Sequence, residues 1–152
     1  MTYNIEIRKI EPIRIAYIKY KGVANETNKI FSEVFKSING RVNGSPFFCY
    51  YKIDEITKIA DMELCVPTEE TPNNKGISVK ITPEINALCT THVGSYETLN
   101  NAYKEIEKYS IENNLILQPP FREVYIKGPG MFFKGNPKNY ITEILFPLKE
   151  VK

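Results

Sequence analysis

The sequence contains no tryptophan, one histidine and three cysteines in 152 residues. Zinc sites are built from clustered cysteine and histidine side chains, and the sequence shows no such cluster. An odd number of cysteines also argues against a disulfide framework and fits a reducing cytosol. We therefore expect Cys49, Cys65 and Cys89 to be small buried side chains, with no metal and no cofactor in the protein.

An excess of charge of one sign and long hydrophobic runs are also missing. Residues 1–76 carry 11 basic and 10 acidic side chains and residues 77–152 carry 9 and 8, so each half has a net charge of +1. Without a basic surface, direct binding to nucleic acid is not expected. No run approaches the roughly 18 apolar residues of a membrane span, and the N-terminus lacks the regions of an export signal. These absences predict a cytoplasmic protein with no membrane partner.

Two stretches of the sequence resemble each other. Residues 16–31 and 88–103 each read as an apolar strand that reaches a glycine, Gly22 or Gly94, and is followed by an amphipathic helix. Further landmarks recur in the same order, namely Pro46 and Pro120, Glu63 and Glu143, and Pro67 and Pro147. Because chance does not readily produce an ordered set of matches, we interpret the chain as a tandem duplication.

The duplication predicts a single domain over residues 1–152, with repeat one over about 1–67, a polar linker at 68–76 and repeat two over about 77–152. Each repeat is predicted as strand-helix-strand-strand with a further strand leading in. Apolar residues recur at helical spacing in both helices, at Ile30, Phe31, Val34, Phe35 and Ile38 and at Leu99, Ala102, Tyr103 and Ile106. Ser95 is a candidate N-cap and Gly40 a candidate stop signal.

The expected fold is α+β. About eight strands form a curved, mainly antiparallel sheet, and two main helices lie on one face of it. Because two helices cannot cover both faces of so many strands, the other face is expected to form a central ligand groove.

Strand alternation indicates which side chains face that groove. If Ile144 and Phe146 lie under the helices, Glu143 and Leu145 point to the open face. By the same reasoning Glu123 and Tyr125 point there, if their neighbours Val124 and Ile126 lie under the helices. These four open-face residues are candidates for the ligand-binding site.

Further candidates come from the repeat and from the strand ends. The repeat matches Tyr51 with Tyr125 and Glu63 with Glu143, while Tyr20 and His92 each lie two residues before a glycine corner. A carboxylate among aromatic walls favours a ligand cation, because the cation compensates the buried charge and aromatic faces attract it. We therefore expect a groove for amphipathic, often cationic or aromatic molecules, with Glu143 as anchor. The alternative is that Glu143 is a solvated strand residue beside a lysine.

The chain resembles the GyrI-like, or bacterial effector-binding, domain family, which is found in multidrug-sensing regulators such as BmrR and Rob and also occurs alone. The resemblance covers nearly the whole chain and rests on residues 11–16, the corners at Gly22 and Gly94, and residues 63–67, 120–125 and 142–147. It implies tandem repeats around a ligand groove that contains an acidic residue, matched here by Glu143 with Glu123 in reserve. Tyr96, in the second corner, joins the ligand-binding candidates. Because the family domain begins almost at residue 1, no helix-turn-helix is expected before it.

The resemblance leaves three functions open. The first is a stand-alone binding module for hydrophobic or cationic compounds in drug sensing or transcription regulation. The second is a hydrolase of electrophilic small molecules, in which Glu143 is the general base and Tyr51 or Tyr125 assists. The third is a protein-directed inhibitor resembling gyrase inhibitory protein, for which Met131, Phe132 and Phe133 would form an apolar patch for a protein partner.

Overall fold

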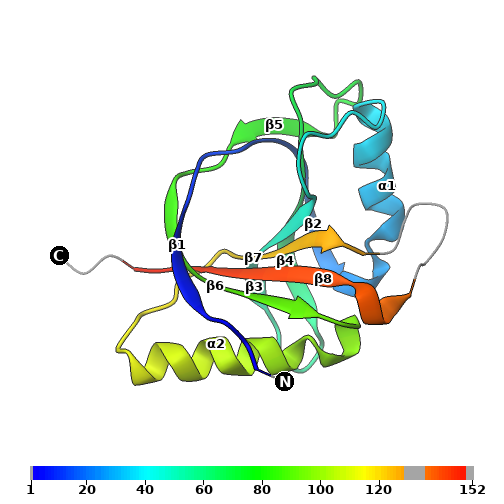
Figure 1. Ribbon diagram of the computed structural model, residues 1–152. Helices are drawn as coiled ribbons and strands as arrows, with labels where there is room; N and C mark the ends of the chain where they lie inside the picture. The colour runs from blue at the N-terminus through cyan, green and yellow to red at the C-terminus, as the bar shows by residue number, and fades with distance from the viewer. Residues whose placement is uncertain (1, 129–135, 150–152) are drawn as a thin grey trace. The chain divides into compact units, whose positions relative to one another are not determined.

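The structure, a computed structural model, describes residues 2–128 and 136–149, which form two compact units (Figure 1). Unit 1 contains Met1–Ile10 and Glu84–Lys152, and unit 2 contains Glu11–Pro83. The described residues include eight strands and two α-helices, and the order strand-helix-strand-strand occurs twice. The predicted α+β class is therefore confirmed. Met131, Phe132 and Phe133 lie outside the described residues.

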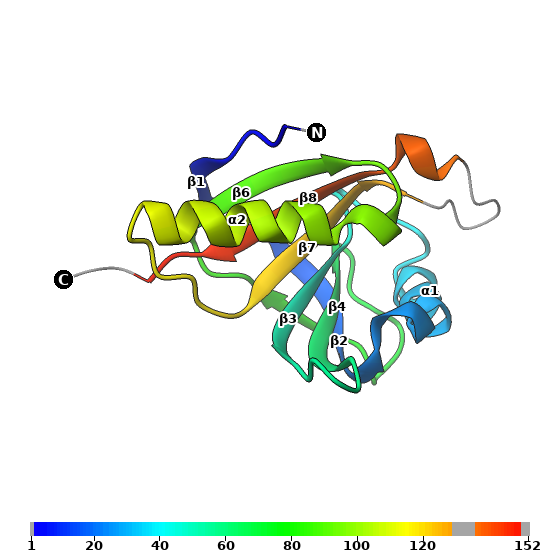
Figure 2. The same ribbon diagram turned by 90° about the horizontal axis from the view of Figure 1, so that it is seen from below.

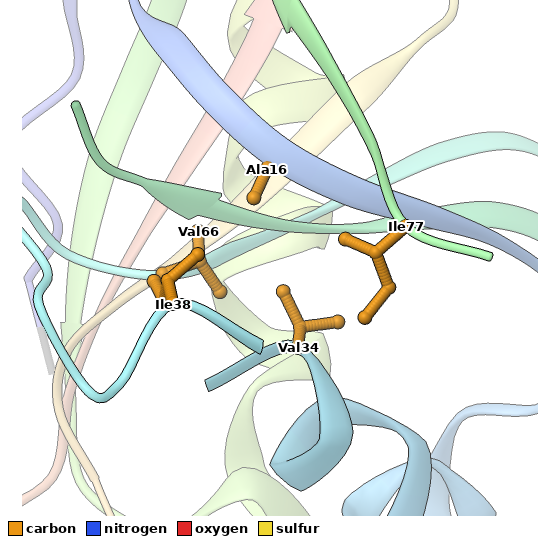
Figure 3. Close-up of a cluster of buried hydrophobic side chains, with 5 residues drawn as sticks. All are labelled: Ala16, Val34, Ile38, Val66 and Ile77. Atoms are coloured by element: carbon orange, nitrogen blue, oxygen red, sulfur yellow. The ribbon is translucent and has the colours of Figure 1, made fainter. Parts of the chain in front are cut away.

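Unit 2 is a four-stranded antiparallel sheet with one helix on one face. Its strands are β2 (Arg14–Val23), β3 (Phe47–Ile53), β4 (Ile59–Pro67) and β5 (Ser78–Ile81), in the spatial order β3-β4-β2-β5. Helix α1 (Asn28–Ser37) follows β2 through a 3-10 turn at Ala24–Glu26. The helix packs Val34 against Ala16 of β2 and Val66 of β4, as Figure 3 shows, with Ile38 and Ile77 in the same cluster. The apolar stripe predicted for this helix is thus its core face.

Helix α1 ends where the sequence predicts. Gly40 adopts a φ of +68°, a left-handed conformation that glycine tolerates best. Its N–H donates a hydrogen bond to the carbonyl oxygen of Phe35 at 2.9 Å, which satisfies a carbonyl of the last helical turn. Asn39, with a φ of +55°, and Gly40 therefore follow the last helical turn in left-handed conformations and turn the chain toward β3.

Unit 1 has the same plan. Its strands are β1 (Glu6–Ile10), β6 (Ile85–Val93), β7 (Phe121–Lys127) and β8 (Ile141–Pro147), antiparallel in the order β1-β6-β8-β7. Helix α2 (Asn100–Glu112) lies along one face of this sheet (Figure 2), where Leu99 and Ala102 pack on Ile144 and Phe146. A 3-10 turn at Pro137–Asn139 precedes β8. Ser95 precedes a 3-10 turn at Tyr96–Thr98, and its side chain makes no capping hydrogen bond, so its prediction as the helix N-cap is wrong.

The strand that leads into each repeat pairs with the other repeat. Strand β1 pairs with β6, placing Arg8 opposite Ala87, and β5 pairs with β2, placing Lys80 opposite Ile15. The polar stretch at 68–76 therefore joins β4 to β5 inside unit 2, and the chain leaves unit 2 at Pro83. Among the described residues no helix is long and apolar enough to cross a membrane. The groove predicted between the two repeats stays a prediction.

Candidate functional site

In unit 2, a buried carboxylate lies on the sheet face opposite α1. Glu63 is only 4% exposed, and its neighbours Leu64 and Met62 point to the other face. The Lys80 ammonium of β5 donates to both carboxylate oxygens of Glu63, at 2.6 and 2.8 Å, and the Tyr51 hydroxyl donates to Oε1 at 2.8 Å. A buried charge needs such partners, because removing it from water costs several kcal/mol.

An open pocket of about 510 Å³ adjoins Glu63. The residues that line it come from strands β2, β3 and β4 of unit 2, and they are Lys19, Tyr20, Lys21, Tyr51, Asp61, Met62 and Glu63. Tyr20 lies opposite Met62 in the pairing of β2 with β4, and alternation from Ala16 turns both side chains to the α1 side of the sheet. The Tyr20 hydroxyl lies over Gly22 there, so the predicted groove position of Tyr20 is wrong. On the Glu63 face the pocket thus combines one phenol, that of Tyr51, with two carboxylates and two lysines.

The local electrostatics keep the Tyr51 phenol protonated. Burial raises the pKa of Tyr51, and the hydrogen bond to the Glu63 carboxylate raises that pKa further. Lys80, which pairs with Glu63, also lies 4.3 Å from the centroid of the Tyr17 ring, a cation–π contact. Tyr51 can therefore act as a hydrogen-bond donor at neutral pH.

Unit 1 places Glu143 in the corresponding position. The predicted facing of β8 is confirmed, because Ile144 and Phe146 lie under α2 while Leu145 packs with Ala87 on the opposite face. Glu143 shares that opposite face, and one of its oxygens lies 2.6 Å from Nη2 of Arg8. Its side chain is 18% exposed. A basic neighbour was part of the alternative interpretation of Glu143, but it is an arginine of β1 and not a lysine.

The surroundings of Arg8 favour the charged form of its guanidinium. Burial lowers the pKa of its guanidinium, but the hydrogen bonds to Glu143 and Cys89 outweigh burial and raise that pKa overall. The Glu143 carboxylate consequently has a permanent internal counter-ion, so an external cation would have to compete with Arg8 or share the carboxylate with it.

The predicted facing of Glu123 and Tyr125 is wrong. Glu123 lies opposite Ile144, so it points to the helix side of the sheet, and the Tyr103 hydroxyl of α2 donates a hydrogen bond to it. Tyr125 is on the same side, and its hydroxyl donates to Glu123 at 2.7 Å. Val124 lies opposite Glu143 and packs with the cluster on that face.

The predicted match of Tyr51 with Tyr125 is also wrong, by one residue. In β3 it is Cys49 that lies opposite Glu63, and in β7 it is Val124 that lies opposite Glu143. The counterpart of Tyr125 is therefore Tyr50 and not Tyr51, which occupies a bulge. A shift by one residue turns every side chain of a strand to the other face.

His92 is fully buried on the helix side of unit 1. Its Nε2 lies 3.1 Å from the Ser95 carbonyl oxygen, which can only accept a hydrogen bond, and 3.0 Å from Oγ1 of Thr98. Nδ1 lies 2.9 Å from the Tyr3 hydroxyl. The neutral tautomer with its hydrogen on Nε2 satisfies all three contacts. The predicted open-face position of His92 is therefore wrong, and the side chain ties the start of α2 to β6.

Tyr96 lies at the same end of unit 1, and its phenol is partly exposed. Its ring contacts the rings of Tyr125 and Tyr140, and burial raises its pKa to about 12. The hydroxyl occupies space next to Gly128, where a Cβ would lie 2.6 Å from it. Tyr96 thus completes an aromatic group with Tyr125 away from the Glu143 face.

The structure also assembles a group that sequence reasoning missed. Cys49 of β3 and Cys65 of β4 are buried beside Glu63, and the nearest ligand atoms of these three residues all lie within 4.8 Å of one another. Burial raises the pKa of the Cys65 thiol, and Cys49 and Glu63 add to that rise. Alternation from Glu63 predicts the facing of Cys65, but the pairing of β3 with β4 cannot be obtained from spacing alone.

Among the described residues phenols therefore pair with two carboxylates, Tyr51 with Glu63 and both Tyr103 and Tyr125 with Glu123. The first lines a pocket and the second lies under a helix. Such a pair can bind a polar or cationic group, or can relay a proton if the carboxylate is released from its other donors. In unit 2 that release requires Lys80 to withdraw from Glu63.

Comparison with known proteins identifies relatives of this fold. Residues 3–149 match the profile of the GyrI-like small molecule binding domain. The C-terminal domain of EcmrR has a TM-score of 0.83 at 25% identity, with 99% of this chain and 100% of that domain covered. In the EcmrR–DNA complex the TM-score is 0.82 at 25% identity with 98% of this chain covered, and the chain spans 58% of the EcmrR chain. A comparison with curated protein sequences gives no match.

More distant structures share the fold. SAV2435 bound to tetraphenylphosphonium has a TM-score of 0.63 at 16% identity, with 98% of this chain and 94% of that chain covered. A hydrolase from Listeria innocua has a TM-score of 0.66 at 12% identity, with coverages of 95% and 91%. At these identities the likeness is one of fold.

Proposed function

The chain belongs to the GyrI-like small-molecule-binding domain family, and from this premise we propose that it binds hydrophobic, often cationic or aromatic, compounds in drug sensing or transcription regulation. The binding of tetraphenylphosphonium by SAV2435 supports this ligand class, since that ion is a cation enclosed by four phenyl rings. The EcmrR–DNA complex supports the regulatory context. In that context we expect this chain to act through a protein partner or by sequestering its ligand.

The observation that carries the proposal is the buried Glu63 carboxylate at the wall of the unit 2 pocket. Tyr51 supplies an aromatic face, and the alkyl stems of Lys19 and Lys21 supply apolar surface on the same side of the sheet as Glu63. A lipophilic cation in the pocket gains dispersion contacts with these walls and electrostatic attraction to the acid. Lys80 can move toward solvent when the ligand arrives, because its side chain is 33% exposed.

Glu143 is the second proposed anchor, in unit 1. It lies on the corresponding face of its sheet, beside Leu145, but it carries Arg8 as an internal partner. The Arg8 guanidinium is additionally held by Cys89, so it is harder to displace from its acid than the Lys80 ammonium, which sits on a flexible stem. We therefore expect Glu143 to contribute less to cation binding than Glu63.

The test is calorimetric titration of tetraphenylphosphonium into the wild-type chain and into Glu63→Gln, Glu143→Gln and Glu33→Gln. Glu33 is an exposed residue of α1, so its variant makes the same change of charge away from the pocket. We expect Glu63→Gln to raise the Kd by about tenfold or more, since a charged contact is worth about 1.5–3 kcal/mol. The same substitution is expected to weaken binding of triphenylphosphine oxide, a neutral aromatic compound, by a smaller factor.

Two outcomes would contradict the proposal. If the wild-type chain binds neither compound, it is not a receptor for this ligand class. If Glu63→Gln, Glu143→Gln and Glu33→Gln all bind tetraphenylphosphonium as the wild type does, neither proposed carboxylate is an anchor.

Hydrolysis of electrophilic small molecules is a second candidate, favoured by the 2.8 Å hydrogen bond between the Tyr51 phenol and Glu63. In this version Glu63 replaces Glu143 as the general base that activates water, and Tyr51 acts as the acid. Turnover of an epoxide probe that is abolished by both Glu63→Gln and Tyr51→Phe would support this reaction. Turnover that survives Glu63→Gln would exclude the named base.

A further inference from the structure

Unit 2 brings two thiols and a carboxylate to one point on the sheet face opposite α1. Cys49 lies directly opposite Glu63 in the pairing of β3 with β4, and Cys65 is two residues beyond Glu63 on the same strand. All three side chains therefore point to the same face. Their nearest ligand atoms lie within 4.8 Å of one another, and each residue is at most 4% exposed.

We propose that Cys49, Cys65 and Glu63 form a binding site for a thiophilic divalent metal ion of the zinc class. Two sulfurs and one carboxylate oxygen are ligands that zinc uses, at about 2.3 Å for sulfur and about 2.0–2.2 Å for oxygen. Ligand atoms around such an ion lie roughly 3.3–3.8 Å apart in a tetrahedron, by geometry from these bond lengths. The three groups have to close in by only about 1 Å, which side-chain rotation can supply.

The charges balance when the ion binds. The site without metal holds two neutral thiols, the Glu63 carboxylate and the Lys80 ammonium. Binding of M²⁺ releases two protons from the thiols and forms two metal–sulfur bonds and one metal–oxygen bond. The doubly positive ion and the two new thiolates cancel, so the net charge stays at zero while Lys80 keeps one carboxylate oxygen of Glu63.

The pocket supplies the access route and the fourth coordination position. Glu63 lines the pocket of about 510 Å³, whereas the two cysteines are not among its lining residues. An ion that enters along the pocket meets the carboxylate first and then the thiols. The fourth ligand on the pocket side would be water or a small exogenous molecule, and the Tyr51 hydroxyl on Glu63 would orient the carboxylate.

This inference goes beyond the proposed function, although both involve Glu63. The cysteines belong to the metal site alone. Cys49→Ser and Cys65→Ser should therefore weaken metal binding strongly while tetraphenylphosphonium binding persists, so failure of one proposal can be distinguished from failure of the other.

The experiment uses the full chain, freed of metal by chelation and kept in a non-thiol reductant. Cadmium is titrated while the ultraviolet thiolate-to-metal charge-transfer band is recorded, and zinc affinity follows from competition. Native mass spectrometry measures the mass gain, which is expected to equal one metal ion minus two hydrogens. We expect one equivalent of Cd²⁺ to saturate the band.

The variants locate the ion. Cys49→Ser and Cys65→Ser are each expected to weaken binding by about 100-fold or more, above the loss caused by removing an outer-shell partner. Glu63→Gln is expected to weaken it by about tenfold. Cys89→Ala is the matched control, because Cys89 is also a buried cysteine outside any disulfide but belongs to unit 1. Circular dichroism checks that each variant folds, and Cys49→Ala or Cys65→Ala replaces a serine variant that does not.

The proposal is overturned if the wild-type chain develops no charge-transfer band at one equivalent of cadmium. It is also overturned if the band survives in the folded Cys49→Ser and Cys65→Ser variants, or if Cys89→Ala abolishes it. Loss of the band in both serine variants together with its retention in Cys89→Ala supports the site as drawn.

Discussion

Arg8 reaches Glu143 across an intervening strand. The two residues belong to β1 and β8, which both pair with β6, yet Nη2 of Arg8 lies 2.6 Å from Oε2 of Glu143. Lys80 of β5 reaches Glu63 of β4 across β2 in the same way. Strands two positions apart are separated by about 9.5 Å, so only a long basic side chain can span that distance. The strand that leads into one repeat therefore neutralises the acid of the last strand of the other repeat, Arg8 pairing with Glu143 and Lys80 with Glu63.

This relationship predicts the cost of losing Arg8. Arg8→Gln leaves Glu143, which is mostly buried, without its ion pair, and we expect the free energy of unfolding to fall by about 1 kcal/mol. Lys9→Gln is the control, because its pair with Glu84 is about half exposed on both sides and should contribute about 0.5 kcal/mol or less. Urea unfolding measures both. Equal losses in the two variants would show that the Arg8 contact is an ordinary surface pair.

Substitution of His92 tests whether this residue stabilises the fold or binds a ligand. Replacing it by leucine removes contacts to Tyr3, Ser95 and Thr98, so we expect the free energy of unfolding to fall by about 2–3 kcal/mol. Tyr3→Phe removes one of these contacts and should cost about 1 kcal/mol. Thermal or urea unfolding of both variants checks the prediction. A variant of His92 with wild-type stability and impaired ligand affinity would restore it to the binding site.

The hydrogen bond between Glu123 and Tyr103 should couple the effects of substituting these two residues on stability. Their counterparts in unit 2 are Phe48 and Phe31, whose rings pack 5.3 Å apart, so a polar pair replaces an apolar one. We expect Glu123→Leu to cost about 1–3 kcal/mol, because it leaves phenols without their acceptor under α2. Tyr103→Phe should cost about 1 kcal/mol, and the double variant should cost less than the sum. Strict additivity in a double-mutant cycle would contradict the pairing.

Tyr96 predicts a loss of stability at high pH. Burial raises the pKa of its phenol to about 12, whereas the unfolded chain loses that proton near pH 10. The folded state therefore binds more protons than the unfolded state between these values, so stability is fully present below pH 10 and falls as the pH rises to 12. Tyr96→Phe should show a shallower fall in unfolding midpoint over this range. Identical pH profiles for the two proteins would contradict the prediction.

Local patterns were sufficient to predict part of the fold. The apolar stripe of α1, the stop at Gly40 and the facing of β8 depend on residues close in sequence, and the structure confirms each. Alternation within β8 could be anchored because Ile144 and Phe146 are both large and apolar. These features need no knowledge of which strands pair.

The remaining errors and omissions concern strand pairing. In β7 the apolar residues Val124 and Ile126 were a misleading anchor, because Val124 packs on the Glu143 face and Ile126 is exposed at a bulge. The register between β7 and β8 determines which face each side chain of β7 points to, and this register cannot be obtained from spacing within one strand. The same is true of Lys80, which meets Glu63 because β5 pairs with β2, and of the two cysteines beside that acid.

Because each leading strand pairs with the other repeat, the order of synthesis determines when each strand can find its partner. Unit 2 is continuous from Glu11 to Pro83 and can fold as soon as it is released, but β1 is synthesised earlier and has its partner in β6, which is made later. During that interval the first strand exposes unpaired backbone groups. Glu6, Arg8 and Lys9 place charges along it, the same device that discourages exposed strand edges from associating with other nascent chains.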